Sequence, residues 1–552
     1  MTVLPQADSS RVDAGSAEVP DTSVGTEFVR IVSGMPEAPA LHWLTLSGAA
    51  SLTWTQLYRR ASGAALRLRE LDPGHGRVAL VAYNSVDWIV AFYGCALLGR
   101  PVVPISPAVT DAEATHMLSL ARVSSLLVVD RVGADSTLAR MTTLAQRLPQ
   151  QPGVYDIAEF GRSVEAFVEP ESVDAGAEFL LQFTSGTTGV PKAAVLSHRA
   201  VLGCARMYAQ GCTARTGESW LNPLPLFHVG GSVAGLLGAM VNGGAYVILD
   251  RFSPEVALRA IREIRPVLVG LVPTMIIDIL GLPGVSASDF ASVRLVIGGA
   301  TAVDPELIAD MENRLGITFM VAYGQSEAPT MTVSAPGDPA AVRTRTLGRC
   351  LPGRDYQVRD KDGNIVPLGE VGELCVRGPL TMTGYLLSDG SLDSAADDAG
   401  WRRTGDLCSM DAVGVLTFHG RIREMIVRGG LNVFPAEVER VLSAHPTISE
   451  AAVFGVPDPR LGERVVAAVL PAPGVDVDLA GVAALATDRL SHYKRPSEWV
   501  IVATLPRTST GKVRKHLLRK WYEDGTLSAR CGAGVGSGSL GTADDSSPPD
   551  LE

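Results

Sequence analysis

A loop rich in hydroxyls and glycines, closed by a lysine, is the strongest chemical signal in this sequence. It follows the apolar run 179–183 and reads Thr184-Ser-Gly-Thr-Thr-Gly-Val-Pro-Lys192. Glycines let backbone N–H groups approach phosphate oxygens, hydroxyls add donors, and the lysine supplies a mobile positive charge. The loop is not a Walker A motif, because Pro191 precedes the lysine and the run 193–196 is typical of a strand. We therefore predict a phosphate-binding loop that leads into a strand.

Two further segments carry polar side chains suited to a nucleotide. The first is Tyr323-Gly-Gln-Ser-Glu327, in which a hydroxyl stands beside a carboxylate. At the end of a strand, such a pair can bind a phosphate oxygen together with its Mg²⁺. The second is the segment 400–407, which contains Asp406. A carboxylate accepts two O–H donors at once, so this residue type suits a ligand with a vicinal diol.

Composition narrows the classes of protein that can hold such a site. The 552 residues carry 48 basic and 59 acidic side chains, a net charge of −11, which argues against nucleic acid as a partner. Only six of the 48 basic residues are lysine, so a retained lysine can indicate a need for a flexible point charge rather than a planar fork. Three lysines, Lys494, Lys515 and Lys520, are expected on a solvated face, with contact to an anionic ligand as the alternative.

The cysteines and the apolar stretches indicate where the protein works. Seven widely spaced cysteines without a C-x-x-C pair fit reduced core thiols better than disulfides or a zinc site. The N-terminal residues have no basic and apolar pattern of a secretory signal. The most apolar stretch, 267–285, contains two prolines and an aspartate, so we expect buried core rather than a membrane span. We expect a soluble cytoplasmic protein with no membrane span.

The pattern of short apolar runs and helical periodicity predicts the elements that position these motifs. Runs typical of strands alternate with amphipathic helices through the first part of the chain, which favours βαβ units and parallel sheets. After residue 344, short strands separated by Asp-Gly or Gly turns favour a small antiparallel unit. From about 424 to 522 the pattern is compact α+β. The predicted class is α/β, with a large N-terminal domain of parallel-rich βαβ sheets plus a small β unit, and a smaller mobile α+β C-terminal domain.

The same patterns give the predicted domain boundaries. The polar, aperiodic first and last segments indicate a flexible arm and a flexible tail. The boundaries are an arm at 1–26, an N-terminal domain at 27–420, a hinge at 421–423, a C-terminal domain at 424–523 and a tail at 524–552.

Taken together, the motifs resemble those of the adenylate-forming (AMP-binding) superfamily, which includes acyl-CoA synthetases. The resemblance covers roughly residues 45–523, and the motifs stand in family order. It extends to 420–432, which resembles the family hinge and the loop after it, and to Pro506-Arg-Thr-Ser-Thr-Gly-Lys512-Val-Arg-Lys515, which resembles the C-terminal lysine motif. Gly298-Gly299-Ala300 is similar to the family's adenine shelf.

The resemblance implies a role for each matching residue. Lys512, Glu327 and Lys192 are the implied catalytic residues, and Thr184 and Glu327 the implied Mg²⁺ ligands. Asp406 and Arg421 are assigned to the ribose, and Ser326 to the α-phosphate. The implied ATP and AMP contacts are Thr184, Ser185, Gly186, Thr187, Thr188, Gly189, Lys192, Gly299, Ala300, Tyr323, Gly324, Gln325, Ser326, Glu327, Asp406, Arg421 and Lys512.

The acyl pocket, the thiol channel and the pivot are implied in the same way. The acyl substrate is assigned to His228, Ser232, Gly235 and Gly298, and the coenzyme A channel to Gly429, Gly430, Leu431 and Asn432. We expect the small residues Gly230, Gly231, Gly235 and Gly298 to leave room for a bulky aliphatic or aryl acid. The pivot falls on Arg423, where the family usually has lysine or aspartate.

The implied reaction has two halves. A carboxylic acid attacks ATP in the presence of Mg²⁺ to give acyl-adenylate and pyrophosphate, and the thiol of coenzyme A then displaces AMP. Domain movement lets one site host both halves. Two alternatives stay open: an acyl-AMP ligase that loads a carrier protein, and a relative that binds nucleotide without adenylating. The sequence leaves open whether the protein is a monomer or a homodimer.

Overall fold

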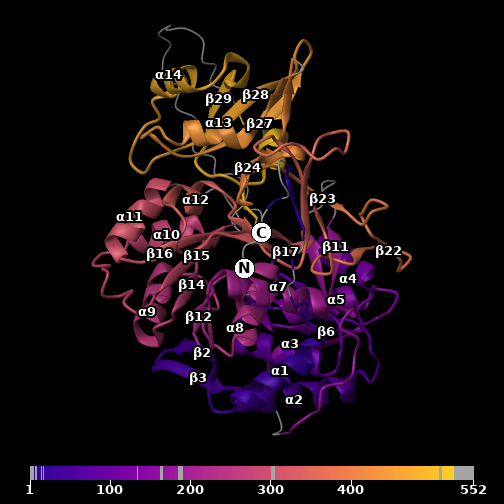
Figure 1. Cartoon of the computed structure of the whole chain (residues 1–552). Helices are drawn as coiled ribbons and strands as arrows, with labels where there is room; N and C mark the ends of the chain where they lie inside the picture. The colour runs from indigo at the N-terminus through magenta and orange to yellow at the C-terminus, as the bar shows by residue number, and fades with distance from the viewer. Residues whose placement is uncertain are drawn as a thin grey trace. The chain divides into compact units, whose positions relative to one another are not determined.

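The computed structural model describes residues 5, 9–13, 15, 18–132, 135–161, 166–184, 191–299, 305–429, 431–508 and 512–527. The chain divides into two compact units, which we call the large unit, Met1–Arg423, and the small unit, Glu424–Glu552. Figure 1 shows the elements of both, and each unit is described by itself below. The predicted α/β class, with a separate C-terminal domain, is confirmed.

An eight-stranded sheet carries the strands on either side of the predicted phosphate loop. Its centre is parallel, and the hairpin of β10 and β11 continues it in antiparallel pairing toward β21 and β22. In sheet order the strands are β22 (Leu392–Asp393), β21 (Gly384–Leu386), β11 (Lys192–Ser197), β10 (Glu178–Thr184), β5 (Val102–Ile105), β4 (Val78–Val81), β6 (Ser125–Val128) and β9 (Gly153–Asp156).

A nine-stranded sheet carries the tyrosine–glutamate segment at the end of one strand. It is parallel from β2 through β16, and β17, β18 and β3 pair antiparallel at its ends. In sheet order the strands are β18 (Arg349–Cys350), β17 (Ala328–Val333), β16 (Thr318–Gln325), β15 (Leu295–Gly299), β14 (Leu268–Gly270), β12 (Trp220–Leu221), β13 (Tyr246–Ile248), β2 (Pro39–Thr45) and β3 (Gly48–Thr53).

Helices cover both faces of these two sheets. Strand β4 is apolar throughout because Val78 and Leu80 enter one core while Ala79 and Val81 enter another, as expected for a parallel strand buried on both faces. The core that contains Val78 also contains residues of both sheets, so the sheets share it. Helices that contribute to this core include α1 (Val24–Gly34), α2 (Trp54–Leu71), α3 (Val86–Leu97), α7 (His198–Gly211), the π-helix η1 (Gly230–Leu237) and α8 (Gly238–Val241).

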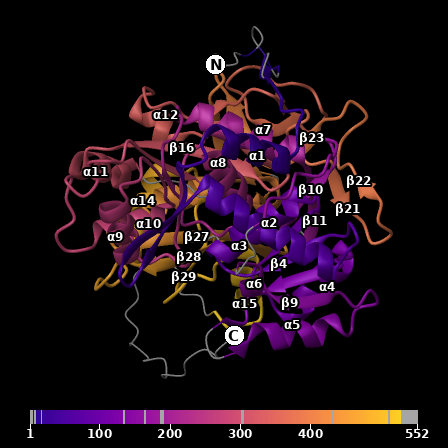
Figure 2. The ribbon, with the colours of Figure 1, turned by 90° about the horizontal axis from the view of Figure 1, so that it is seen from below.

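The outer faces of the two sheets have their own helices and cores. Figure 2 shows α4 and α5 on the eight-stranded sheet, with which they share a core; α5 packs against β9 and α4 against β11. Figure 1 shows α9, α10 and α11 beside the nine-stranded sheet, with which they share a core. The remaining helices of the large unit are α4 (Asp111–Ala121), α5 (Thr137–Ala145), α6 (Ile157–Gly161), α9 (Pro254–Ile264), α10 (Pro273–Leu280), α11 (Pro305–Leu315), α12 (Ala340–Arg345) and the 3-10 turn η2 (Ile422–Glu424), and a short hairpin joins β7 (Arg131–Val132) to β8 (Asp135–Ser136).

The predicted small β unit is an antiparallel sheet of five strands. Its central pairings, β19 with β20, β20 with β23 and β23 with β24, are antiparallel, as the Asp-Gly and Gly turns of the sequence predicted. In sheet order the strands are β1 (Arg11–Val12), β19 (Asp355–Arg359), β20 (Gly372–Arg377), β23 (Arg402–Met410) and β24 (Leu416–Arg421).

The small unit is an α+β fold with its own apolar cores. Its long hairpin packs helices against both faces, and each face contributes to a separate core. The strands are β25 (Ile426–Arg428), β26 (Leu431–Val433), β27 (Ile448–Asp458), β28 (Gly462–Pro471) and β29 (Glu498–Ile501), and the helices are α13 (Pro435–Leu442), α14 (Leu479–Arg489), the 3-10 turn η3 (His492–Lys494) and α15 (Lys515–Glu523).

Two expectations drawn from composition can be compared with the described part of the chain. None of its helices is both long and apolar enough to cross a membrane. Six cysteines in it are buried free thiols, as predicted, and Cys531 lies outside the described residues.

Candidate active site

The predicted phosphate loop joins two adjacent strands of the eight-stranded sheet. Thr184 ends β10 and lies opposite Lys192, the first residue of β11, so the loop begins and ends at one point of the sheet edge. Ser185, Gly186, Thr187, Thr188 and Gly189 lie outside the described residues. The backbone thus fixes where the hydroxyl-rich loop leaves and re-enters the sheet.

Lys192 and Glu327 both contact the side chain of Tyr385. The ammonium of Lys192 lies 5.0 Å from the centre of the Tyr385 ring, a cation–π distance. The Tyr385 hydroxyl donates a 2.7 Å hydrogen bond to Oε1 of Glu327. Among the described residues Lys192 forms no ion pair. A cation and a carboxylate therefore share one aromatic neighbour.

The backbone around Glu327 holds this arrangement in place. Glu327 lies in the turn between β16 and β17, and its carbonyl accepts a 2.7 Å hydrogen bond from the backbone of Met382. Tyr385 lies on β21, where its backbone is opposite Ala194 of β11. Burial first, and then the charge of Glu327, raise the pKa of Tyr385, so its hydroxyl stays a donor at neutral pH.

A second cluster surrounds Asp406, which is buried. Tyr323 donates its hydroxyl to Oδ2 of Asp406, and Nε of Arg421 lies 3.2 Å from Oδ1. Asp406 and Arg421 are opposite each other on β23 and β24, so the pairing of these strands sets their contact. Burial and the neighbouring Asp406 raise the pKa of Tyr323 well above its ordinary value. Each carboxylate oxygen can accept more than one donor, so Asp406 retains capacity for a hydroxyl of a ligand.

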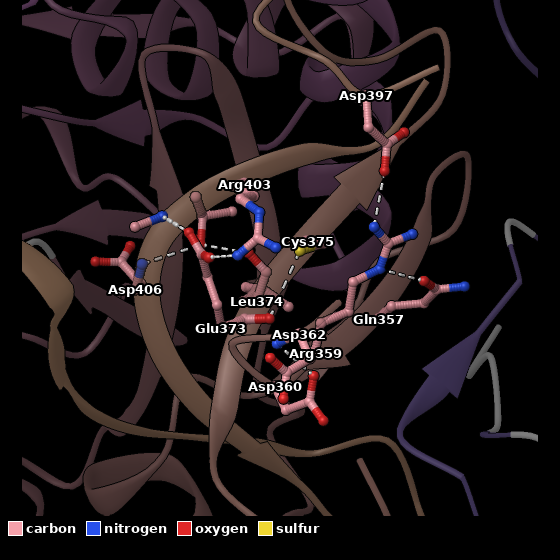
Figure 3. Close-up of polar contacts among 12 residues, drawn as sticks. Gln357, Arg359, Asp360, Asp362, Glu373, Leu374, Cys375, Asp397, Arg403 and Asp406 are labelled. Carbon is pink, nitrogen blue, oxygen red and sulfur yellow. Dashed lines mark hydrogen bonds and ion pairs between the residues drawn. The ribbon is translucent and has the colours of Figure 1, made fainter. Parts of the chain in front are cut away.

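The segment that carries Asp406 is supported from the neighbouring strand. Figure 3 shows Glu373 between Arg403 and the backbone next to Asp406. Oε1 of Glu373 accepts a 3.1 Å hydrogen bond from the backbone of Gly405, and Oε2 accepts a 2.5 Å bond from Arg403. No local sequence pattern indicates this role for Glu373, because its partner lies on another strand.

The predicted adenine shelf begins at the end of β15. A Cβ added to Gly299 would lie 2.0 Å from the carbonyl oxygen of Ala322, its partner on β16, so only glycine fits there. Ala300 lies outside the described residues. Gly324 and Gln325 are the last two residues of β16, and Ser326 lies in the turn that follows, directly before Glu327. Their contacts with a nucleotide stay a prediction.

The predicted acyl segment is packed more tightly than expected. Oγ of Ser232 donates a 3.0 Å hydrogen bond to the carbonyl of His228, and the His228 ring lies 4.9 Å from that of Phe227. A Cβ on Gly235 would lie 2.7 Å from the Asn222 amide, because the glycine sits against that side chain. That the acid lies beside this segment stays a prediction.

Three of the four small residues named above pack against protein atoms on the side where a Cβ would point. That they leave room for an acid stays a prediction. A Cβ on Gly231 would lie 2.3 Å from the Pro225 carbonyl oxygen, and one on Gly298 would lie 2.6 Å from the Phe319 ring. As at Gly235, protein atoms already occupy the space beside each Cα. These glycines allow close packing of the chain itself.

The small unit carries the predicted lysine and thiol-channel residues. Gly429, Leu431 and Asn432 lie in the turn and second strand of the β25–β26 hairpin, while Gly430 is outside the described residues. Gly429 has a positive φ of 59°. The backbone N–H of Lys512 donates a 3.1 Å hydrogen bond to Oγ1 of Thr508. The meeting of these residues with a substrate stays a prediction.

The remaining lysines of the small unit differ from expectation. Lys515 forms ion pairs of 3.0 Å with Glu424 and 2.7 Å with Glu439, and Lys494 pairs with Glu437 at 2.7 Å. The predicted solvated face is therefore wrong for Lys494 and Lys515, because acidic side chains distant in sequence enclose them. The division between the two units falls after Arg423, at the end of the segment 421–423 that is predicted as the hinge.

The donor set around Glu327 fits Mg²⁺ held jointly with phosphate. The described residues contain no cluster of three or more side chains able to hold a metal on their own. Mg²⁺ is commonly bound by one or two carboxylates together with substrate phosphates and water. A carboxylate at Glu327 and a hydroxyl at Thr184 are oxygen donors of the required kind.

Comparison with known proteins identifies the family of this chain. The family model described as AMP-binding enzyme matches residues 28–386, and that described as AMP-binding enzyme C-terminal domain matches residues 437–512. A 3-[(3aS,4S,7aS)-7a-methyl-1,5-dioxo-octahydro-1H-inden-4-yl]propanoyl:CoA ligase of Rhodococcus jostii is 32% identical, over 86% of this chain and 94% of its own. An indoleacetate–CoA ligase of Aromatoleum aromaticum is 34% identical, over 85% and 93%.

A solved structure extends the comparison to three dimensions. The ATP-bound structure of MatB from Rhodopseudomonas palustris superimposes with a TM-score of 0.82 at 25% identity, over 91% of this chain and 99% of that one. Enzymes of this kind activate a carboxylic acid with ATP and transfer the acyl group to coenzyme A, and Mg²⁺ is typical of them. This chain belongs to the AMP-binding, adenylate-forming family and is an acid–thiol ligase of the acyl-CoA synthetase kind.

Proposed function

We propose that the large unit carries the adenylation site and that Lys192, Glu327 and Asp406 do its chemistry. The observation that supports this is the convergence on Tyr385, which contacts both Lys192 and Glu327. These residues come from separate motifs, yet the fold gives them one shared neighbour. A cation beside a metal-binding carboxylate is the pair that a triphosphate with Mg²⁺ requires.

Each residue then has a part in the first half-reaction. Asp406, with Arg421 beside it, accepts the ribose hydroxyls and fixes the nucleotide. Glu327 and Thr184 hold Mg²⁺, which offsets phosphate charge when bound. Lys192 follows the departing pyrophosphate with its flexible ammonium, and Ser326 holds the α-phosphate. Lys512 stands between the attacking carboxylate and the α-phosphate, because two anions must meet there and a cation offsets their repulsion.

The second half-reaction uses the junction between the units. We propose that the chain turns at Arg423, which removes Lys512 and presents Gly429, Gly430, Leu431 and Asn432 to the thiol of coenzyme A. The β25–β26 hairpin supports this proposal, because a tight turn at Gly429 can approach a narrow channel. Domain movement is a known way for one site to serve two reactions.

For the acid, we propose a bulky carboxylic acid that carries a ring. The support comes from the names of two relatives, which act on a bicyclic propanoate and on indoleacetate. We also propose that the enzyme acts in the cytoplasm, in keeping with the six buried free thiols of the described residues.

Pyrophosphate exchange with ATP, measured across a panel of acids, tests the proposal. The panel holds arylacetic, alicyclic propanoic and medium-chain fatty acids, and each sample is run with and without Mg²⁺. We expect exchange that depends on both the acid and Mg²⁺ and is fastest with a ring-bearing acid. Exchange fastest with an unbranched fatty acid would contradict the proposed acid class, and absence of exchange with every acid would contradict adenylation.

A further inference from the structure

The segment that carries Asp406 is a β-bulge. In the pairing of β20 with β23, Glu373 lies opposite Leu407 and Cys375 lies opposite Arg403. Leu374 therefore faces three residues, 404–406, where regular pairing would give it one. Bulges commonly redirect a side chain next to a functional site. Asp406 is the last residue of this bulge, so the bulge backbone sets the direction in which its side chain leaves the strand.

Several contacts hold the bulge, and Glu373 makes two of them. Its carboxylate accepts the backbone N–H of Gly405 at 3.1 Å and the guanidinium of Arg403 at 2.5 Å. Oγ1 of Thr404 donates to the Leu374 carbonyl at 2.7 Å and accepts from the Asp406 backbone at 3.2 Å. Gly405 has a positive φ of 75°, a conformation that glycine adopts readily.

Because Glu373 is buried, its carboxylate depends on hydrogen bonds from the protein. Its side chain is 8% exposed, whereas that of Arg403 is 50% exposed. A buried carboxylate needs hydrogen-bond donors, and here the donors are the bulge backbone and one arginine (Figure 3). Removing the carboxylate leaves the Gly405 N–H without its acceptor, so the bulge loses one of the hydrogen bonds that tie it to β20.

We infer that Glu373 is a positioning residue: by holding the 404–406 bulge, it fixes the Asp406 carboxylate where the ribose hydroxyls of ATP bind. The inference rests on the proposed contact between Asp406 and the ribose. Glu373 itself touches no substrate in this scheme. It acts through Gly405, the residue just before Asp406.

A purely structural role for Glu373 makes a different prediction from a positioning role. A structural role would lower the amount of folded enzyme and affect all nucleotides alike. A positioning role lowers the preference for ATP over deoxynucleotides, because only the hydroxyl contact is weakened. The ratio of kcat/KM for ATP to kcat/KM for 2′-deoxyATP or 3′-deoxyATP does not depend on the folded fraction.

The experiment measures this ratio in pyrophosphate exchange for the wild type and four variants. Glu373→Leu removes both contacts, and Arg403→Met removes only the ion pair. Asp406→Asn tests the proposed ribose contact itself. Asp355→Asn is the matched control, because Asp355 pairs with Arg377 at 2.6 Å on the same sheet, directly across β19 and β20.

We expect a wild-type preference for ATP of about tenfold to a hundredfold over at least one deoxynucleotide, the range for hydrogen bonds to a charged group. Glu373→Leu and Asp406→Asn should lose most of it, Arg403→Met part of it, and Asp355→Asn none. If Asp406→Asn loses the preference while Glu373→Leu and Arg403→Met keep it, the inference is overturned. If Asp406→Asn keeps it, the proposed ribose contact is wrong. Should Glu373→Leu fail to fold, Arg403→Met decides.

Discussion

Tyr385 connects two residues that the sequence assigned separately. Its hydroxyl binds Glu327 and its ring faces Lys192, so one side chain contacts a cation and an anion. Tyr385 is therefore the shared neighbour of the lysine proposed to bind phosphate and the carboxylate proposed to bind Mg²⁺.

Replacing this tyrosine tests its effect on the phosphate site. Tyr385→Phe keeps the ring over Lys192 but removes the hydrogen bond to Glu327. We expect kcat/KM for ATP to fall about tenfold, on the scale of one hydrogen bond to a charged group, and half-maximal exchange to need more Mg²⁺. Pyrophosphate exchange at a series of Mg²⁺ concentrations measures both effects.

The control for Tyr385→Phe is another tyrosine with a buried hydrogen bond. Tyr58 on α2 donates its hydroxyl to the Val168 carbonyl at 2.9 Å, in the helical core of the large unit. Tyr58→Phe should leave the Mg²⁺ dependence unchanged. An equal shift in both variants would indicate that loss of packing, and not loss of the Glu327 contact, is responsible.

At the scale of elements, an ion pair between Asp72 and the buried Arg100 lies at the C-terminal end of α2. Asp72, the residue after the helix, accepts Arg100 at 2.6 Å and Ser125 of β6 at 2.7 Å. Arg100 also donates to Ser124 at 2.7 Å and is 1% exposed. Burial by itself would raise the pKa of Asp72, but these hydrogen bonds and the Arg100 charge outweigh it and lower the pKa to about 2.

This pKa predicts how stability depends on pH. Because the folded pKa of Asp72 lies below the ordinary 3.8, its contribution is complete above about pH 4 and is lost as the pH falls toward 2. Asp72→Asn should lower the free energy of unfolding by about 2 kcal/mol at pH 7 and by about half as much at pH 3. Urea unfolding of both proteins at the two pH values measures the difference, and a difference that grows on acidification would contradict the pair.

At the scale of the whole molecule, each unit has an apolar core of its own. Val453 and Val465 belong to a core formed entirely by the small unit, and Phe454 and Val466 belong to another. Adjacent residues of β27 and β28 thus face opposite sides of the sheet. A unit with complete cores can move without exposing its interior, which the proposed turn at Arg423 requires.

Lys512 tests whether the two half-reactions use different arrangements of the units. Lys512→Ala should reduce pyrophosphate exchange by roughly 10²–10³-fold, the scale for removing one charge-stabilising contact in a transition state. Thioester formation from supplied acyl-adenylate and coenzyme A should change far less. Equal losses in the two assays would contradict the two-arrangement proposal.

The sequence by itself determined the family, the fold class and most elements that carry the motifs. Hydroxyl, glycine and lysine spacing is local, so the loop at 184–192 and the segment at 323–327 can be identified without a structure. Helix ends such as Thr53, which forms a capping box with Gln56 on α2, are also set by nearby residues. Features that depend on interactions between nearby residues can therefore be predicted from the sequence.

Only the tertiary structure decided which side chains meet. Tyr385 and Glu327 are 58 residues apart, and Glu373 and Gly405 are 32 apart. Their contacts depend on the pairing of strands and on one bulge, which local patterns do not encode. The same holds for the enclosed Lys515 and for the glycines that pack against protein atoms. Contacts between distant residues follow from the assembled sheets, because strand register places each side chain.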